Sequence, residues 1–229
     1  MRETKKQKLI SKEIKENEIY KLPDALELTK KLASKKFDES LDLAIVLGVD
    51  AKKSDQLVRG IMSLPKMPEK KVKIAVFAEG DAAKKAKDAG ADIVGSDDLL
   101  EKVKKSEIDF DKCISTPELM SKVGTLGQIL GPKGLMPNPK LGTVTKDVAE
   151  AIKKVRSGQI EYKTDKTGIV HASVGKISFS LEELKKNILF FYNELIKNKP
   201  TNSKGVFIKK IFISSTMGPG LQVDLSSVM

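Results

Sequence analysis

The sequence contains very few of the residues from which metal sites and catalytic sites are usually built. Its 229 residues include one cysteine, Cys113, one histidine, His171, and no tryptophan. One cysteine cannot form an internal disulfide, and one cysteine with one histidine cannot supply the usual four zinc ligands. Cys113 lies in a short apolar run, which favours a buried thiol over a nucleophile. We therefore expect no metal, no cofactor and no catalytic pair of nucleophile and base.

Long apolar runs are also missing. No stretch approaches the ~20 apolar residues that a membrane-spanning helix requires. The N-terminus is basic, but Ile10 is followed by Ser-Lys-Glu rather than by the apolar segment of a signal peptide. We therefore expect a cytoplasmic protein.

Positive charge, by contrast, is in excess. The chain has 42 Lys and Arg against 31 Asp and Glu, a formal net charge of +11. A strongly basic protein attracts polyanions such as nucleic acid. The excess is uneven within the middle of the chain: residues 67–120 carry −2, and residues 121–159, which include a Gly/Pro-rich stretch, carry +5. This concentration favours a phosphate-binding role over charge that serves only solubility.

Aromatic residues are scarce, with 8 Phe and 3 Tyr. Proteins that bind single-stranded nucleic acid usually stack bases on exposed aromatic side chains. The composition therefore favours folded RNA, which is recognised through its shape, phosphates and 2′-hydroxyl groups.

The pattern of apolar residues changes twice along the chain. Between residues 72 and 123, short apolar strands alternate with helices, which is typical of βαβ units and a mainly parallel sheet. On either side, strands follow one another in hairpins around a long helix, for which Ser180 and Glu183 have the spacing of a capping box. We predict an α+β domain of residues 1–66 plus 159–229, with helices layered on an antiparallel sheet. A βαβ domain of residues 67–158 is inserted into it.

Two nucleotide-binding motifs fail on inspection. The stretch Gly127–Gly134 contains Gly-Pro-Lys-Gly, but no Ser or Thr follows Lys133 to bind Mg²⁺, and a predicted helix rather than a strand comes before it. The dinucleotide fingerprint is absent after the predicted strand Val72–Ala78. An α/β enzyme acting on a nucleotide or on RNA stays open as the alternative to an RNA-binding protein.

A donor-rich segment, Ser214–Gly220, follows a predicted strand near the C-terminus. Its hydroxyls and the backbone N–H groups near its glycines are suitable donors for phosphate and sugar oxygens. An ordinary hairpin loop is the other interpretation of the same residues.

Five stretches of the sequence share one resemblance. They are Ser214-Ser215-Thr216-Met217-Gly218-Pro219-Gly220, the run from Gly127 to Lys140 (GQILGPKGLMPNPK), Lys36-Phe37-Asp38-Glu39-Ser40, Gly90-Ala91-Asp92-Ile93-Val94-Gly95 and Asp165-Lys166-Thr167-Gly168-Ile169-Val170-His171. These motifs resemble those of the ribosomal protein L-one family of the large subunit. The similarity is collinear from about Tyr20 to Asp224, and the middle motif alone is long enough to be highly specific.

The resemblance implies a split α+β domain that carries an inserted Rossmann-like domain. It also implies binding to large-subunit ribosomal RNA in the mobile stalk beside the tRNA exit site, release of deacylated tRNA, and repression of the protein's own messenger RNA. A monomer is expected when the protein is free. The RNA contacts implied by the motifs are Lys36, Phe37, Ser40, Lys166, His171, Ser214, Thr216, Met217 and Gly218, with Lys133 and Lys140 as secondary contacts.

Overall fold

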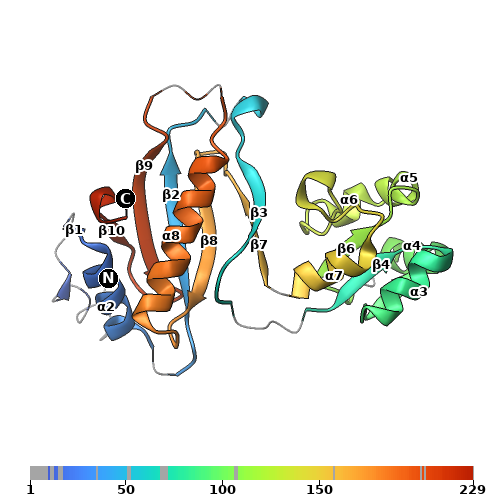
Figure 1. The fold of residues 1–229 in the computed structure, drawn as a ribbon, viewed down its shortest axis with the longest axis horizontal. Coiled ribbons are helices and arrows are strands. Elements are labelled where there is room, and N and C mark those ends of the chain that lie inside the picture. Colours follow the sequence, from blue (N-terminus) through green and yellow to red (C-terminus); the bar gives the residue numbers. More distant parts are fainter. Residues whose placement is uncertain are drawn as a thin grey trace. The chain divides into compact units, whose positions relative to one another are not determined.

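The computed structural model describes residues 10, 13–14, 18–34, 36–50, 53–67, 72–105, 108–156, 158–201, 203 and 205–228 (Figure 1). The chain forms two compact units. Unit 1 comprises Met1–Pro68 and Ile160–Met229, and unit 2 comprises Glu69–Gln159. Helices and sheets occur in both units, so the predicted mixed α and β class is confirmed at this level.

Unit 1 is built on a five-stranded sheet with the order β1-β10-β9-β2-β8. Its strands are β1 (Ile19–Tyr20), β2 (Ser40–Leu47), β8 (Ile169–Lys176), β9 (Ile208–Ser215) and β10 (Leu221–Val223). Neighbouring strands are antiparallel except for β1 and β10, which are parallel. The prediction of a wholly antiparallel sheet is wrong at this edge, because β1 does not follow β10 through a hairpin. Strand β1 belongs to the N-terminal part of the chain, far from β10 in sequence, and a helix follows it directly.

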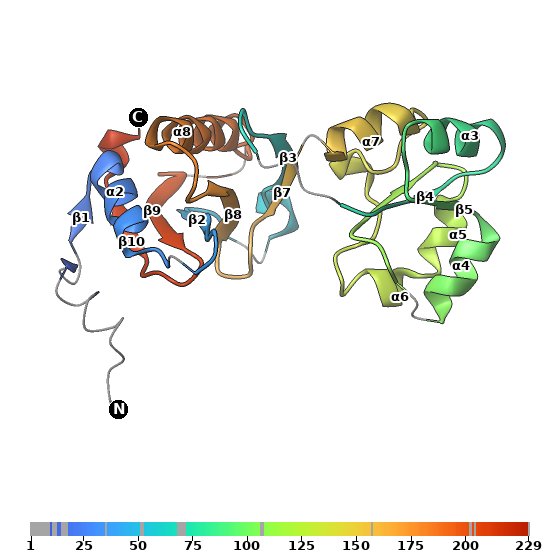
Figure 2. The same cartoon turned by 90° about the horizontal axis from the view of Figure 1, so that it is seen from below.

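One face of this sheet is covered by helices α2 (Leu22–Leu32) and α8 (Leu181–Lys197). Figure 2 shows α8 lying over β2, β8 and β9. Along β2 every second residue from Leu41 to Leu47 is buried in the core formed with these helices, and the alternate residues from Ser40 to Val46 are only half-buried. No helix among the described residues covers this second face, which we call the open face.

The long helix α8 begins where the sequence predicts. The Ser180 Oγ accepts a hydrogen bond from the Glu183 backbone N–H at 3.2 Å, and the Glu183 carboxylate accepts one from the Ser180 N–H at 3.1 Å. This reciprocal pair is the predicted capping box, which is confirmed. The cap fixes the start of the helix that closes the covered face.

A two-stranded ribbon, β3 (Arg59–Ser63) with β7 (Gln159–Lys163), adjoins the sheet. Tyr162 is 1 % exposed and packs edge-on against Phe191 of α8, with ring centroids 5.7 Å apart. A Cβ atom at Gly60 would lie 2.5 Å from the Tyr162 hydroxyl, so only glycine allows this approach. The short 3-10 helices η1 (Ser54–Gln56) and η3 (Leu225–Ser227) complete the described part of unit 1.

Unit 2 has a three-stranded parallel sheet with the order β5-β4-β6. Apolar clusters pack on both of its faces. The elements are β4 (Ile74–Phe77), α3 (Gly80–Asp88), β5 (Ile93–Gly95), α4 (Asp97–Lys104), β6 (Lys112–Ser115), α5 (Met120–Gly124) and α7 (Val148–Arg156). One cluster joins Ala75 and Phe77 to helices α4 and α5, and the other joins Ile74 and Val76 to α3 and α7.

The Gly/Pro-rich stretch of unit 2 is more ordered than the sequence suggests. It contains a short helix, α6 (Gly127–Leu130), and a 3-10 turn, η2 (Pro139–Leu141). Leu130 is fully buried, and Ile129 and Leu135 pack against the same core. Burial of these apolar residues stabilises the helix where glycine and proline content alone predicts only a loop.

Candidate nucleic-acid interface

Two predicted segments from opposite ends of the chain meet at one edge of the open face. The Ser40 backbone N–H donates to the Thr216 Oγ1 at 2.9 Å, and the Thr216 N–H donates to the Ser40 carbonyl oxygen at 3.1 Å. Pairing of β2 with β9 sets Asp42 opposite Ser214. The segment after β9 therefore lies beside Lys36–Ser40, as the split arrangement of the chain predicts.

The Glu39 carboxylate links these segments through hydrogen bonds to their backbone. Its side chain is buried, at 1 % exposure, and its Oε1 accepts from the Ser34 N–H at 2.7 Å while its Oε2 accepts from the Met217 N–H at 3.3 Å. A buried carboxylate is stable only when hydrogen bonds replace its water. No local pattern indicates this role, because Glu39 lies beside exposed Asp38 and immediately before the alternation of β2 begins.

Large apolar side chains project into solvent at the same edge. Phe37 is 51 % exposed and Met217 is 61 % exposed, and Lys36 beside Phe37 is exposed as well. Exposed apolar groups next to cations suit a surface that stacks on or packs against a nucleic acid. Phe37 is thus exposed to solvent rather than buried in the core.

Not every residue of the predicted segment is available to a ligand. Ser215 is 3 % exposed, and its Oγ has no hydrogen-bond partner among the described residues. A Cβ atom on Gly218 would lie 2.4 Å from this Oγ, so Gly218 is required by close packing. Ser214 and Ser215 thus differ: the first lies on the open face and the second is buried beneath the turn.

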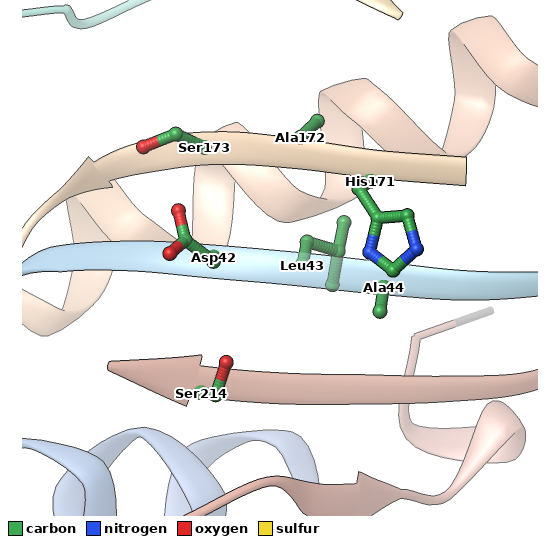
Figure 3. Close-up of a pocket in the computed structure, with 7 residues that line it drawn as sticks. All are labelled: Asp42, Leu43, Ala44, His171, Ala172, Ser173 and Ser214. Carbon is green, nitrogen blue, oxygen red and sulfur yellow. The ribbon is translucent and has the colours of Figure 1, made fainter. Parts of the chain in front are cut away.

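The middle of the open face forms a hollow lined by Asp42, Leu43, Ala44, His171, Ala172, Ser173 and Ser214 (Figure 3). Strand register sets Ser173 and Ser214 on either side of Asp42, and sets His171 and Phe212 on either side of Ala44. Sequence reasoning found His171 and Ser214 but missed Asp42 and Ser173. The alternation of β2 could have placed Asp42 on the uncovered face, but only the register shows its neighbours.

The remaining predicted residues lie elsewhere. Lys166 is exposed in the turn before β8, at the Leu47 end of β2, where the Leu47 N–H donates to the Gly168 carbonyl oxygen at 2.9 Å. At ~3.3 Å per residue, this end lies ~20 Å from Ser40. Lys133 is exposed in unit 2 after α6, and Lys140 lies in η2 with its side chain outside the described residues. The nine primary residues therefore spread along the sheet rather than forming one cluster.

Within the described ranges, no group of three His, Cys, Asp or Glu side chains could hold a metal ion. Burial raises the pKa of the Cys113 thiol to about 12, so at neutral pH the sulfur stays protonated and is a poor nucleophile. The helices of the described part also include none that is long and apolar enough to cross a membrane.

Comparison with known proteins identifies the family. The model of the Ribosomal protein L1p/L10e family matches residues 29–219, most of the chain. The chain belongs to this family. The resemblance inferred from the sequence motifs is thereby confirmed.

Curated relatives cover almost the whole chain. A Legionella pneumophila (strain Corby) protein named large ribosomal subunit protein uL1 is 55% identical over 225 residues, which is 98% of this chain and 97% of the relative. Relatives of the same name from Nitrosomonas eutropha and Coxiella burnetii (strain Dugway 5J108-111) are 54% and 51% identical to this chain. Each alignment spans at least 98% of this chain and at least 97% of the relative. These names agree with the prediction of a ribosomal protein rather than an enzyme.

Proposed function

We propose that this protein is a structural constituent of the large ribosomal subunit that binds large-subunit ribosomal RNA through the open face of unit 1. Its relatives are named as proteins of that subunit. In the ribosome it would form the mobile stalk near the tRNA exit site and aid release of deacylated tRNA. Bound to its own messenger RNA, it would repress translation. Free in the cytoplasm, it would be a monomer.

The observation that carries this proposal is a sheet face that bears polar and basic groups and that no described helix covers. Sheet faces in soluble proteins usually bury apolar residues or carry scattered polar ones. Here hydroxyls, an imidazole and a carboxylate line a shared hollow, next to exposed Phe37 and Met217. Hydroxyl and N–H donors suit phosphate and sugar oxygens. The proposed contacts are Lys36, Phe37, Ser40, Lys166, His171, Ser214, Thr216, Met217 and Gly218.

Asp42 adds a carboxylate acceptor to the hydroxyls and the imidazole of the hollow. A carboxylate repels phosphate, so its position between Ser173 and Ser214 suits a 2′-hydroxyl or a base amino group. This residue would help distinguish RNA from DNA instead of adding general affinity.

We further propose that the two units are the domains expected from the sequence, residues 1–66 plus 159–229 and residues 67–158. The parallel order β5-β4-β6, with helices on both faces, supports a Rossmann-like inserted domain. In this domain Lys133 and Lys140 are the candidates for secondary RNA contacts.

Met217→Asp tests the proposed surface most cleanly. The Met217 side chain is exposed, whereas the Thr216 hydroxyl accepts the Ser40 N–H, so a Thr216 variant would also disturb the fold. A carboxylate facing RNA should weaken binding to a stalk RNA fragment roughly tenfold or more, a loss of about 1.4 kcal/mol, with an unchanged thermal melt.

The matched control is Ile196→Asp, an exposed apolar residue of α8. Binding is measured by gel shift against a random duplex, at several salt concentrations, because phosphate contacts make affinity fall steeply with salt. Equal RNA affinity of Met217→Asp and Ile196→Asp would refute the proposed binding surface. A melting shift of the protein with ATP, NAD or S-adenosylmethionine would instead support the alternative of an α/β enzyme.

A further inference from the structure

Strand β9 carries a β-bulge opposite the end of β2. Val46 pairs with Lys210 and Leu47 pairs with Ile208, so Lys209 is an extra residue without a partner on β2. Both lysines are exposed. A bulge changes the direction in which side chains leave a strand, and here it presents two consecutive lysines where strict alternation would expose one.

These lysines gather with a third at the same end of the sheet. Lys210 shares the open face with Val46, and Val46 pairs on its other side with Ile169. The Lys209 Cε lies 3.4 Å from where a Cβ atom on Gly48 would stand. Lys166 lies in the turn whose Gly168 carbonyl accepts the Leu47 N–H. The three lysines therefore surround the end of β2.

The ammonium groups of these lysines form no ion pair within the part of the chain that the structure describes, in contrast to those of Lys31, Lys66, Lys73 and Lys122. Asp165 precedes Lys166, and its Oδ1 accepts the Lys166 backbone N–H at 2.7 Å rather than pairing with an ammonium group. Cations that lack a carboxylate partner remain available to phosphate.

We propose that Lys209 and Lys210, with Lys166, form a second phosphate-binding site of unit 1. It lies ~20 Å along β2 from the Ser40 and Thr216 edge, counting six residues at ~3.3 Å each. One RNA would then be held at both ends of the open face, with its backbone running along β2. The inference rests on the proposed function of unit 1 and adds to it two lysines and a direction for the RNA.

The test compares two lysine pairs in the full chain. Lys209→Ala with Lys210→Ala removes the bulge lysines, and Lys185→Ala with Lys186→Ala removes an adjacent exposed pair from α8, which packs on the covered face. Both double variants lose the same charge. Binding to a large-subunit stalk RNA is measured across salt concentrations, and thermal melts check that each variant is folded.

The bulge variant should bind on the order of tenfold more weakly at physiological salt, with a slope of log affinity against log salt that is smaller by ~1–2. The α8 variant should keep the wild-type slope. With an RNA truncated so that it reaches only the Met217 end, the two double variants should bind alike.

If the two double variants lost the same affinity for the untruncated stalk RNA, the second site would be overturned. An unchanged salt slope for Lys209→Ala with Lys210→Ala would overturn it as well. Failure of the proposed function looks different. In that case the wild-type protein would not prefer stalk RNA to a random duplex, and Met217→Asp would have no effect.

Discussion

The two sheets of this protein differ in how many of their faces are covered. In unit 2, all four residues of β4 are buried, because helices pack on both sides of the parallel sheet. In unit 1, buried and half-buried residues alternate along β2, because the described helices cover only one side. A face that no described helix covers can accept a large ligand, so the comparison supports the proposal that RNA binds to unit 1.

The sequences of the two strands show this contrast only in part. Ile74-Ala75-Val76-Phe77 is a continuous apolar run, which is typical of a strand in a parallel sheet. In β2 only Ser40 and Asp42 are polar, and Leu43–Leu47 is also a continuous apolar run, so the burial pattern distinguishes the two strands better than their composition. Substitutions in unit 2 should therefore act on stability, and substitutions on the open face should act on binding.

The largest expected effect is on the stability of unit 2. Ile114 of β6 is fully buried, and Ile114→Ala should lower the free energy of unfolding by about 2–5 kcal/mol. Urea titration followed by labelling of Cys113, which is also in β6 and buried, reports the opening of this unit. Val46→Ala on the open face should lower the free energy of unfolding of unit 1 much less, by about 1 kcal/mol or below. Similar losses for the two variants would break the comparison.

Glu39 is the exception within unit 1, because it lies beneath the binding edge. Glu39→Gln replaces one of the two carboxylate oxygens by an NH2 group, which cannot accept a hydrogen bond, so the backbone N–H of either Ser34 or Met217 loses its acceptor. Leaving a buried donor unpaired costs about 1–3 kcal/mol, and the displaced Met217 segment should also bind RNA more weakly. Thermal melts and gel shifts measure both effects. Glu182→Gln, at an exposed position of α8, is the control and should change neither.

Asp42→Ala tests whether the Asp42 carboxylate raises or lowers RNA affinity. If charge alone governed binding, loss of a carboxylate from the open face would strengthen RNA binding. If Asp42 accepts a hydrogen bond from RNA, the variant should bind RNA more weakly by about 1 kcal/mol, roughly fivefold. Asp24→Ala in α2 removes the same charge from the covered side and serves as the control. Tighter RNA binding by Asp42→Ala would exclude the proposed acceptor role.

The smallest expected effect concerns the pairing of Lys66 with Glu183, at the start of α8. The Lys66 ammonium, together with the Ser180 N–H, holds the pKa of Glu183 below its ordinary value. A lowered folded-state pKa contributes stability above the unfolded pKa of ~4.3, and this stability is lost as pH falls through the folded value. Lys66→Ala should therefore lower the melting temperature slightly at pH 7. This difference should shrink below pH 4, and a difference that grows in acid would contradict the assignment.

The local part of this fold could be predicted from the sequence. Ser180 and Glu183 identified the start of α8, and the alternation of short strands and helices between residues 72 and 123 indicated the parallel sheet of unit 2. These signals depend on residues close together in the chain. Helix α6 was missed because burial of Leu130, rather than local preference, stabilises it.

The candidate site was predicted only in part, for a related reason. Ser214 and His171 were found through motifs, but their neighbour Asp42 depends on the register of three strands. Likewise Lys209 is distinguished only by a bulge, which is a property of the β2 and β9 pair and not of either strand alone. Interactions between residues that are distant in sequence leave no periodic signal in either segment.

Lysine footprinting of the full chain, with and without stalk RNA, tests the central claim most directly. Each exposed lysine is modified by a small amine-reactive reagent and quantified by mass spectrometry. If RNA lies on the open face of unit 1, it should protect Lys36, Lys166 and Lys210, whereas Lys185, Lys186 and Lys197 of α8 should stay as reactive as in the free protein. Protection of the α8 lysines, with Lys36 and Lys210 still reactive, would contradict the account.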